Sequence, residues 1–178
     1  MYIRQTKSED LDDILMVQRD AFGEEDEASL TADLLADPSA APCLSLMAFG
    51  DERPVGHVLF TKVVVTGASE NISASILAPL AVIPEAQGQG VGDQLTREGL
   101  RQLAESGTDL VFVLGHPEYY PRFGFRPAGV DNLNAPFPVP PEHAGAWMVL
   151  ALRDGIIGQV EGQVKCADKL NKPEYWSE

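Results

Sequence analysis

Hydrophobic and polar residues alternate along this chain with either the period of a β-strand or the period of an α-helix. A change from one period to the other predicts the boundary between two elements. Runs with a period of two, rich in β-branched residues, are typical of half-buried strands. Apolar residues near the helical period, such as Val91, Leu95, Leu100 and Leu103, are typical of an amphipathic helix. The predicted strands are 2–5, 43–50, 55–66, 73–83, 109–115 and 145–155, and the predicted helices are 8–22, 27–37, 90–106 and a short one from 117 to about 124.

The run 73–83 does most to define the fold class. It is almost entirely apolar, so we expect a central strand covered on both faces. Pro79 interrupts it, and because Pro has no N–H for a ladder, a bulge or local splaying is expected there. A helix then links this strand to the buried strand 109–115, which predicts a parallel crossover. With the hairpins before it, this order predicts an α/β (α+β) fold with a mixed, mostly antiparallel central sheet and flanking helices.

The net charge of the chain limits the classes of partner that it is expected to bind. Its 178 residues, the length of one domain, carry 13 Lys and Arg against 27 Asp and Glu, a net charge of −14. That field repels nucleic acid and anionic membranes, so neither is expected as a partner. Cys43 and Cys166 have no neighbour at metal-ligand spacing, so no metal site is expected. The opening residues contain no apolar signal core, and we expect a soluble, cytoplasmic protein.

A glycine-rich loop, EAQGQGVGDQL at 85–95, precedes the predicted helix at 90–106. Glycines let the backbone approach a ligand closely, and a helix N-terminus offers unpaired N–H groups, so a phosphate is the expected guest. A nucleoside triphosphatase is disfavoured because no Lys follows the loop, and a dinucleotide fold is disfavoured because the spacing is GxGxG. A tight turn without a ligand is the alternative for the glycines taken alone.

The stretch PLAVIPEAQGQGVGDQLTREGL, at 79–100, resembles the acetyl-CoA signature of the GNAT superfamily of N-acetyltransferases. YYPRFGF, at 119–125, resembles the second landmark of that family, a Tyr four residues before Gly-Phe. Its context resembles the bacterial subgroup called predicted N-acetyltransferases. The resemblance covers 1–153 as one domain, whose sheet would contain a splayed parallel pair. We expect 154–178 to add an edge hairpin and a loosely attached tail to that domain.

The resemblance implies that acetyl-CoA is the co-substrate and that its acetyl group moves to a primary amine by direct attack. Backbone N–H groups of the loop would hold the pyrophosphate, and Arg97, Arg101 or Arg122 would help to bind the ribose phosphate. Val82 would donate its N–H to the thioester oxygen, and Tyr120 would protonate the departing thiolate, with Tyr119 as the alternative. The implied cofactor-binding residues are Leu80, Ala81, Val82, Gln87, Gly88, Gln89, Gly90, Val91, Gly92 and Tyr120.

No residue stands out as the general base that a protonated amine requires. The candidates are Glu24, Glu25, Glu27, Glu70 and His116, each of which is more commonly a solvated surface group. The acidic stretch 22–40, before the second predicted strand, suits a polyamine, an aminoglycoside-like amine or a lysine side chain as acceptor. Two further expectations stay open: a homodimer formed through a free sheet edge, and, as the alternative function, a module that senses acyl-CoA without turnover.

Overall fold

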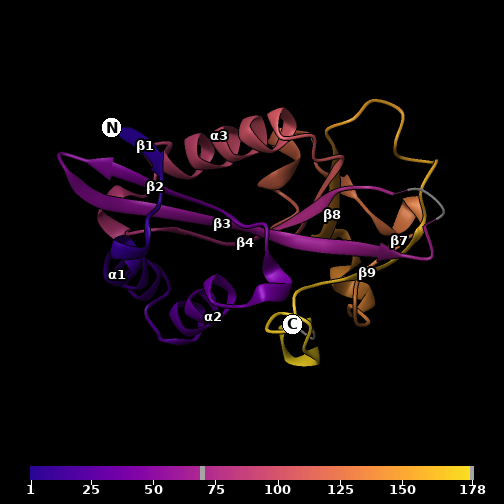
Figure 1. Cartoon of the computed structure of the whole chain (residues 1–178), viewed down its shortest axis with the longest axis horizontal. Coiled ribbons are helices and arrows are strands. Elements are labelled where there is room, and N and C mark those ends of the chain that lie inside the picture. Colours follow the sequence, from indigo (N-terminus) through magenta and orange to yellow (C-terminus); the bar gives the residue numbers. More distant parts are fainter. Residues whose placement is uncertain (69–70, 177–178) are drawn as a thin grey trace.

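A long, split β-sheet with helices on both faces forms the framework of the protein (Figure 1). The computed structural model describes residues 1–68 and 71–176. The strands are β1 (Tyr2–Gln5), β2 (Leu44–Gly50), β3 (Arg53–Thr66), β4 (Ala74–Val82), β5 (Leu110–Leu114), β6 (Arg126–Pro127), β7 (Leu133–Asn134), β8 (Trp147–Ala151) and β9 (Gly162–Lys165), and the α-helices are α1 (Leu11–Phe22), α2 (Asp26–Leu35) and α3 (Val91–Glu105).

Within the described residues, nine strands follow the order β1-β2-β3-β4-β5-β8-β6, with β9 beside β3 and β7 beside β9. Pairs β1–β2, β2–β3, β3–β4 and β5–β8 are antiparallel, and β4–β5 is parallel. Helices α1 and α2 cover one face of the sheet, and α3, which connects β4 to β5, covers the other (Figure 1). The predicted mixed, mostly antiparallel sheet with flanking helices is therefore confirmed.

The parallel pair β4–β5 opens partway along its length. Register is kept only from Ala74 opposite Leu110 to Ile76 opposite Phe112, and from Leu77 onward β4 pairs with β3 alone. The predicted splayed pair is thus present. On the β3 side, the register between β3 and β4 shifts next to Pro79, as the missing N–H of proline predicts.

Helix α3 lies very close to the sheet because two glycines remove side chains from the contact. A Cβ atom at Gly56 of β3 would lie 2.8 Å from the side chain of Val91. One at Gly99 of α3 would overlap the ring of Phe60 on β3. Only glycine allows this approach, which brings the N-terminus of α3 directly beside β4.

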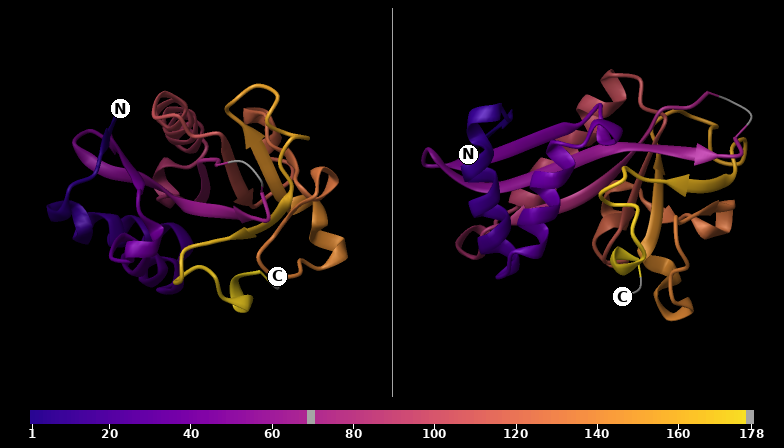
Figure 2. Two further views of the ribbon diagram at one scale, coloured as in Figure 1. Left: turned by 45° about the vertical axis from the view of Figure 1, so that its right-hand side comes forward. Right: turned by 60° about the horizontal axis from the view of Figure 1, so that its bottom comes forward.

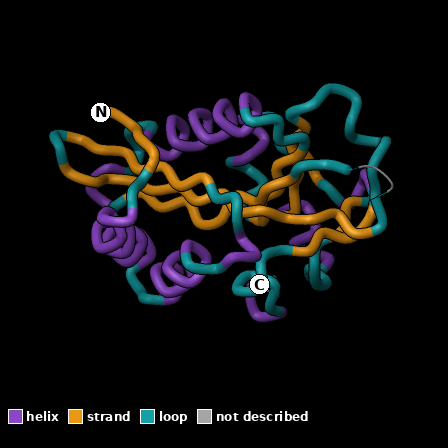
Figure 3. The backbone as a smooth tube through the Cα atoms, viewed as in Figure 1, coloured by secondary structure: helices purple, strands orange, loops and turns teal. Residues whose placement is uncertain are grey.

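The segment 116–125 forms less helix than we expected. After a turn it contains a 3₁₀ helix only at Tyr120–Phe123, which ends at Gly124 in the left-handed region at φ 103°. Pro121 explains the difference, because a proline in this position has no N–H to continue an α-helical ladder from the residues before it. Loops and short 3₁₀ turns of this kind fill much of the C-terminal half (Figure 3).

The C-terminal region differs from the expected edge hairpin and loose tail. Gly155, Gly158 and Gly162 all have positive φ and bend the chain repeatedly, so only β9 forms, antiparallel to β3 and parallel to β7. The tail is fastened by Trp176, which is 2% exposed and packs edge-on against Trp147 with ring centroids 5.4 Å apart. It runs back across the molecule from β9 (Figure 2).

Across the described ranges, none of the helices combines the length and the apolarity that crossing a bilayer requires.

Candidate functional site

The glycine-rich loop lines a cleft of about 620 Å³ at the N-terminus of α3, which we call the loop cleft. Gly88 and Gly90 adopt left-handed conformations, at φ 77° and 84°, that turn the backbone into the helix. The first α-helical hydrogen bond joins Gln94 N–H to the Gly90 carbonyl, and among the described residues no hydrogen bond uses the N–H groups of 88–93. Six free donors at the positive end of a helix dipole form a site for an anion.

The edge of β4 that faces away from β3 forms one wall of the loop cleft. Ile83 N–H donates to the Val55 carbonyl at 3.0 Å, so Ile83 points its polar groups toward β3. Because successive residues of an antiparallel pair alternate in direction, Val82 and Leu80 point theirs away from β3, into the split beside β5. The side-chain amide of Gln87 donates to the Val82 carbonyl at 3.0 Å and ties the loop to this edge.

Tyr119 is committed to a polar cluster beside α3. Its hydroxyl donates to Asp93 at 2.7 Å, and Arg122 lies 3.5 Å from the same carboxylate and 4.3 Å from the centre of the Tyr119 ring. Partial burial, followed by the bond to Asp93, raises the pKa of Tyr119 well above its usual value. The Tyr119 hydroxyl therefore stays protonated, and its proton is already donated to Asp93.

Tyr120 is in a different situation, although it is the next residue. The ring is 7% exposed, fits against Gly115, where a Cβ would lie 2.5 Å from it, and packs edge-on against Phe125. No hydrogen bond engages its hydroxyl within the described part of the chain. Burial raises the pKa of Tyr120 to about 12, so the group remains a protonated donor at neutral pH.

A second cleft of about 370 Å³, the tail cleft, lies on the α1–α2 face of the sheet. Its walls come from α2, the split between β4 and β5, and the C-terminal tail. Tyr120, Leu80 and His116 line both clefts, so the two meet where β4 and β5 separate. The lining residues are Phe22, Glu27, Leu30, Ile76, Leu77, Ala78, Pro79, Leu80, Val113, Leu114, Gly115, His116, Tyr120, Leu170, Tyr175 and Trp176.

Glu27 is the one carboxylate among the residues that line the tail cleft. Its Oε2 is enclosed and has no hydrogen-bond partner among the described residues. Burial raises the pKa of Glu27, a hydrogen bond from its own backbone N–H opposes the rise, and the nearby charges of Glu24 and Asp26 add to it. An enclosed acceptor without a donor is costly.

Most of the predicted site residues meet at these clefts. Eight line the loop cleft, but Ala81 is buried with its polar groups directed at β3, and Gln89 turns its side chain to the Glu85 carbonyl. Arg122 lines the loop cleft, whereas Arg101 is paired with Glu98 and Glu105. The eight are Leu80, Val82, Gln87, Gly88, Gly90, Val91, Gly92 and Tyr120.

Some of the candidate general bases line the tail cleft and others lie outside it. Glu27 and His116 line the tail cleft, while Glu25 is exposed and paired with Arg19, and Glu24 lies outside the lining. Glu70 lies outside the described residues. Two partners were not predicted from the sequence: Asp93, which holds Tyr119, and the tail, whose aromatic pair Tyr175 and Trp176 in a polar segment was the available signal.

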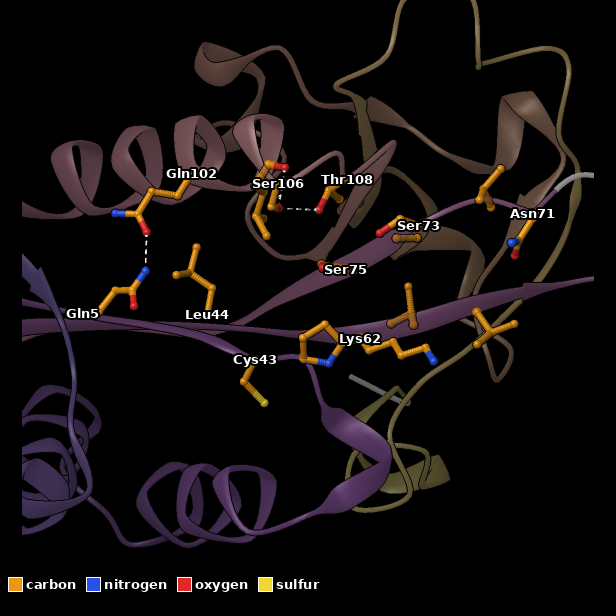
Figure 4. A pocket seen from close by; sticks show the side chains of 16 residues that line it. Gln5, Cys43, Leu44, Lys62, Asn71, Ser73, Ser75, Gln102, Ser106 and Thr108 are labelled. Atoms are coloured by element: carbon orange, nitrogen blue, oxygen red, sulfur yellow. Dashed lines mark hydrogen bonds between the residues drawn. The ribbon is translucent and has the colours of Figure 1, made fainter.

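Another cavity, of about 590 Å³, lies at the far end of α3 and is separate from both clefts (Figure 4). Two pairs of its polar side chains are hydrogen-bonded to each other: the Gln5 amide donates to Gln102 at 2.8 Å, and the hydroxyls of Ser106 and Thr108 lie 3.5 Å apart. It contains neither the glycine loop nor Tyr120. In the described ranges, His, Cys, Asp and Glu side chains form no cluster of three or more that could hold a metal ion.

Known proteins are similar to this chain in sequence and in fold. Residues 2–128 match the family model of the acetyltransferase (GNAT) domain. The chain is 47% identical over 164 residues to the uncharacterized N-acetyltransferase YjhQ of Escherichia coli K12, covering 92% of this chain and 90% of that protein. Among solved structures it is similar to the GNAT family N-acetyltransferase YhbS from Escherichia coli in complex with CoA, with a TM-score of 0.85, 35% identity, and coverage of 96% and 92%.

A GNAT family acetyltransferase from Brucella melitensis in complex with acetyl-CoA is also similar, with a TM-score of 0.74, 29% identity, and coverage of 95% of this chain and 97% of that one. These matches extend over most of the chain. The chain belongs to the GNAT family of N-acetyltransferases.

Proposed function

We propose that the protein transfers the acetyl group of acetyl-CoA directly to a primary amine, with the two substrates bound from opposite faces of the sheet. The observation that carries the proposal is the meeting of the loop cleft and the tail cleft at Tyr120. In the transfer, the amine nitrogen bonds to the thioester carbonyl carbon, the carbon–sulfur bond breaks, and the products are an acetamide and CoA.

The free N–H groups of 88–93 would hold the pyrophosphate of acetyl-CoA, which explains how a chain of net charge −14 can bind an anion. The outward backbone groups of Leu80 would pair with the pantetheine arm as a neighbouring strand does, while the Val82 carbonyl accepts from Gln87. The same geometry directs the Val82 N–H toward the split, where it would donate to the thioester oxygen as negative charge develops there.

A bound ammonium must lose two protons to become an acetamide, and the sulfur must gain one. The first proton leaves before the attack and frees the lone pair of the nitrogen, and we assign its acceptor to Glu27, the one carboxylate that lines the tail cleft. The second leaves the nitrogen after the attack and replaces the proton that is given to the sulfur. The sulfur gains one, and we assign its donor to Tyr120, whose hydroxyl is not used in any other hydrogen bond there. Tyr119 is unsuited to that task because its hydroxyl is held by Asp93.

Thermal unfolding with acetyl-CoA, desulfo-CoA and ATP tests the assignment of the loop cleft. A ligand at about 100 times its dissociation constant stabilises the folded state by ~2.7 kcal/mol, which raises Tm by a few degrees for a domain of this size. We expect both CoA compounds to raise Tm and ATP to leave it unchanged. An equal shift with ATP, or no shift with either CoA compound, would contradict the assignment.

Replacing Glu27 by Gln tests the base. We expect kcat/KM to fall by about 10²-fold at neutral pH, because a positioned base contributes at least that much. In the parent, activity should decline as pH falls through the raised pKa of Glu27, above the usual range of a glutamate, and this limb should be absent in Glu27→Gln. Rates between pH 4 and 9 check both points, and an unchanged acid limb in the variant would exclude Glu27.

The same substitution should not destabilise the fold. Because the pKa of Glu27 is raised in the folded state, its charged form costs free energy at pH above that pKa, and the cost disappears as pH falls below the unfolded value. We therefore expect the unfolding free energy of Glu27→Gln at pH 7 to equal or exceed that of the parent. Denaturant titration measures it and separates loss of catalysis from loss of folding.

A further inference from the structure

Glu27 is the one carboxylate in the lining of the tail cleft, but further carboxylates lie near its wall residue Tyr175. Burial raises the pKa of Tyr175, and the charges of Glu174, Asp33, Asp26 and Glu27 add to the effect. Of the acidic residues between Asp20 and Glu27, only Glu27 contributes to its lining. The others, such as Glu24 and Asp26, are exposed. Of the acidic side chains from which the sequence suggested an acceptor site for polyamines or aminoglycosides, Asp26 and Asp33 therefore lie near the tail cleft, and Glu27 alone contributes to its lining.

Aromatic and aliphatic side chains from separate segments make up the remaining wall. Phe22 ends α1, Leu30 lies on α2, and Tyr175 and Trp176 come from the C-terminal tail. Trp176 is buried and donates its indole N–H to the Leu170 carbonyl at 3.2 Å, so it offers the cleft no free donor. A ligand with many hydroxyl or ammonium groups would lose its water against this wall and find few partners.

We propose, on the basis of the function proposed above, that the acceptor is a small primary monoamine with a compact apolar or aromatic body, bound by its ammonium at Glu27 and by its body against Phe22, Tyr175 and Trp176. The cleft volume of about 370 Å³ is at the small end of the range for ligand sites. One carboxylate in the lining matches one ammonium group, and the apolar wall matches a body that carries no second charge.

Two amines of equal length give a sharp comparison: hexylamine and 1,5-diaminopentane differ only in whether the far end is a methyl or an ammonium group. We expect kcat/KM for acetylation of hexylamine, measured by release of the CoA thiol, to exceed that of the diamine at least 30-fold. 2-Phenylethylamine should be better than hexylamine, while spermidine, kanamycin and Nα-acetyl-lysine should be poor. The inference would be overturned if kcat/KM for the diamine, spermidine, kanamycin or Nα-acetyl-lysine equalled that for hexylamine. It would also be overturned if none of the amines were acetylated.

Tyr175→Ala tests the aromatic wall, with Tyr2→Ala as the matched control. Both side chains are partly exposed tyrosines, at 37% and 52%, and Tyr2 lies on β1 outside both clefts. We expect KM for 2-phenylethylamine to rise at least fivefold in Tyr175→Ala and to stay at the parent value in Tyr2→Ala, with affinity for acetyl-CoA unchanged in both. Equal KM values in the two variants would remove the tail from acceptor recognition.

The outcomes separate this inference from the function on which it rests. Desulfo-CoA cannot react, so its effect on Tm reports the loop cleft alone, whatever amine is used. Protein that binds desulfo-CoA and acetylates a polyamine best would contradict the acceptor class and leave the transferase in place. Protein whose Tm does not respond to desulfo-CoA would contradict the proposed function itself.

Discussion

We expect Gly90→Glu to abolish acetyl-CoA binding while the chain stays folded. Gly90 caps α3 at φ 84°, and a Cβ placed there would meet no atom within 4 Å, so a side chain has room. Its left-handed conformation costs a non-glycine residue about 1 to 2 kcal/mol, which a domain of this size can tolerate. The new carboxylate would lie among the free N–H groups of the loop and repel the pyrophosphate. Calorimetry should show a dissociation constant raised at least 100-fold.

Gly158→Glu is the matched control for this experiment. Gly158 is also exposed and also has positive φ, at 95°, and a Cβ added to it would likewise meet no atom within 4 Å. It lines neither cleft, so the variant carries the same added charge and a similar backbone strain away from the site. Similar loss of affinity in both variants, or full affinity in Gly90→Glu, would show that the anion is bound elsewhere. Circular dichroism confirms that each variant is folded.

Tyr120→Phe should lower kcat at least tenfold and leave the affinity for acetyl-CoA nearly unchanged. The phenylalanine ring keeps the contacts with Gly115 and Phe125, so only the proton donor is lost. A tenfold change corresponds to about 1.4 kcal/mol in the barrier. Because the pKa of Tyr120 is about 12, the hydroxyl stays protonated between pH 6 and 9, and the deficit should be constant across that range. Steady-state rates at saturating acetyl-CoA measure it.

Tyr119→Phe distinguishes the two tyrosines. It removes a hydroxyl that is bonded to Asp93, on the side of the loop cleft. We expect it to raise KM for acetyl-CoA and to lower kcat by less than threefold. A larger loss of kcat in Tyr119→Phe than in Tyr120→Phe would reverse the assignment of the proton donor.

The parts of the site that local patterns encode could be predicted from the sequence. The apolar run of β4, the period of α3 and the glycines between them define a strand, a loop and a helix without knowledge of any distant residue. Pro79 predicted an irregularity because its missing N–H acts at that position alone, and the register shift beside it confirms this. The motif around Tyr120 located the tyrosine that lies between the two clefts.

Features that depend on contacts between distant residues could not be predicted in this way. Five acidic or histidine side chains were equal candidates for the base, because the enclosure of Glu27 results from packing around α2 and the tail cleft. The C-terminal strand pattern suggested a hairpin, but β9 pairs with the end of β3, from Val64 to Thr66, which is distant in the sequence. The tail was expected to be loose, and although the pair Tyr175 and Trp176 was a local signal, nothing in its sequence identifies Trp147 as the residue against which Trp176 packs.

The opening between β4 and β5 has a consequence for inhibition. Because Tyr120 borders both clefts, a short bridge could join a CoA-like group on one face of the sheet to an amine-like group on the other. Attachment of the first group would hold the second at a high effective concentration near its own cleft, so the joined compound would bind far more tightly than either half. The length of that bridge would depend on how widely the two strands diverge after Ile76 and Phe112.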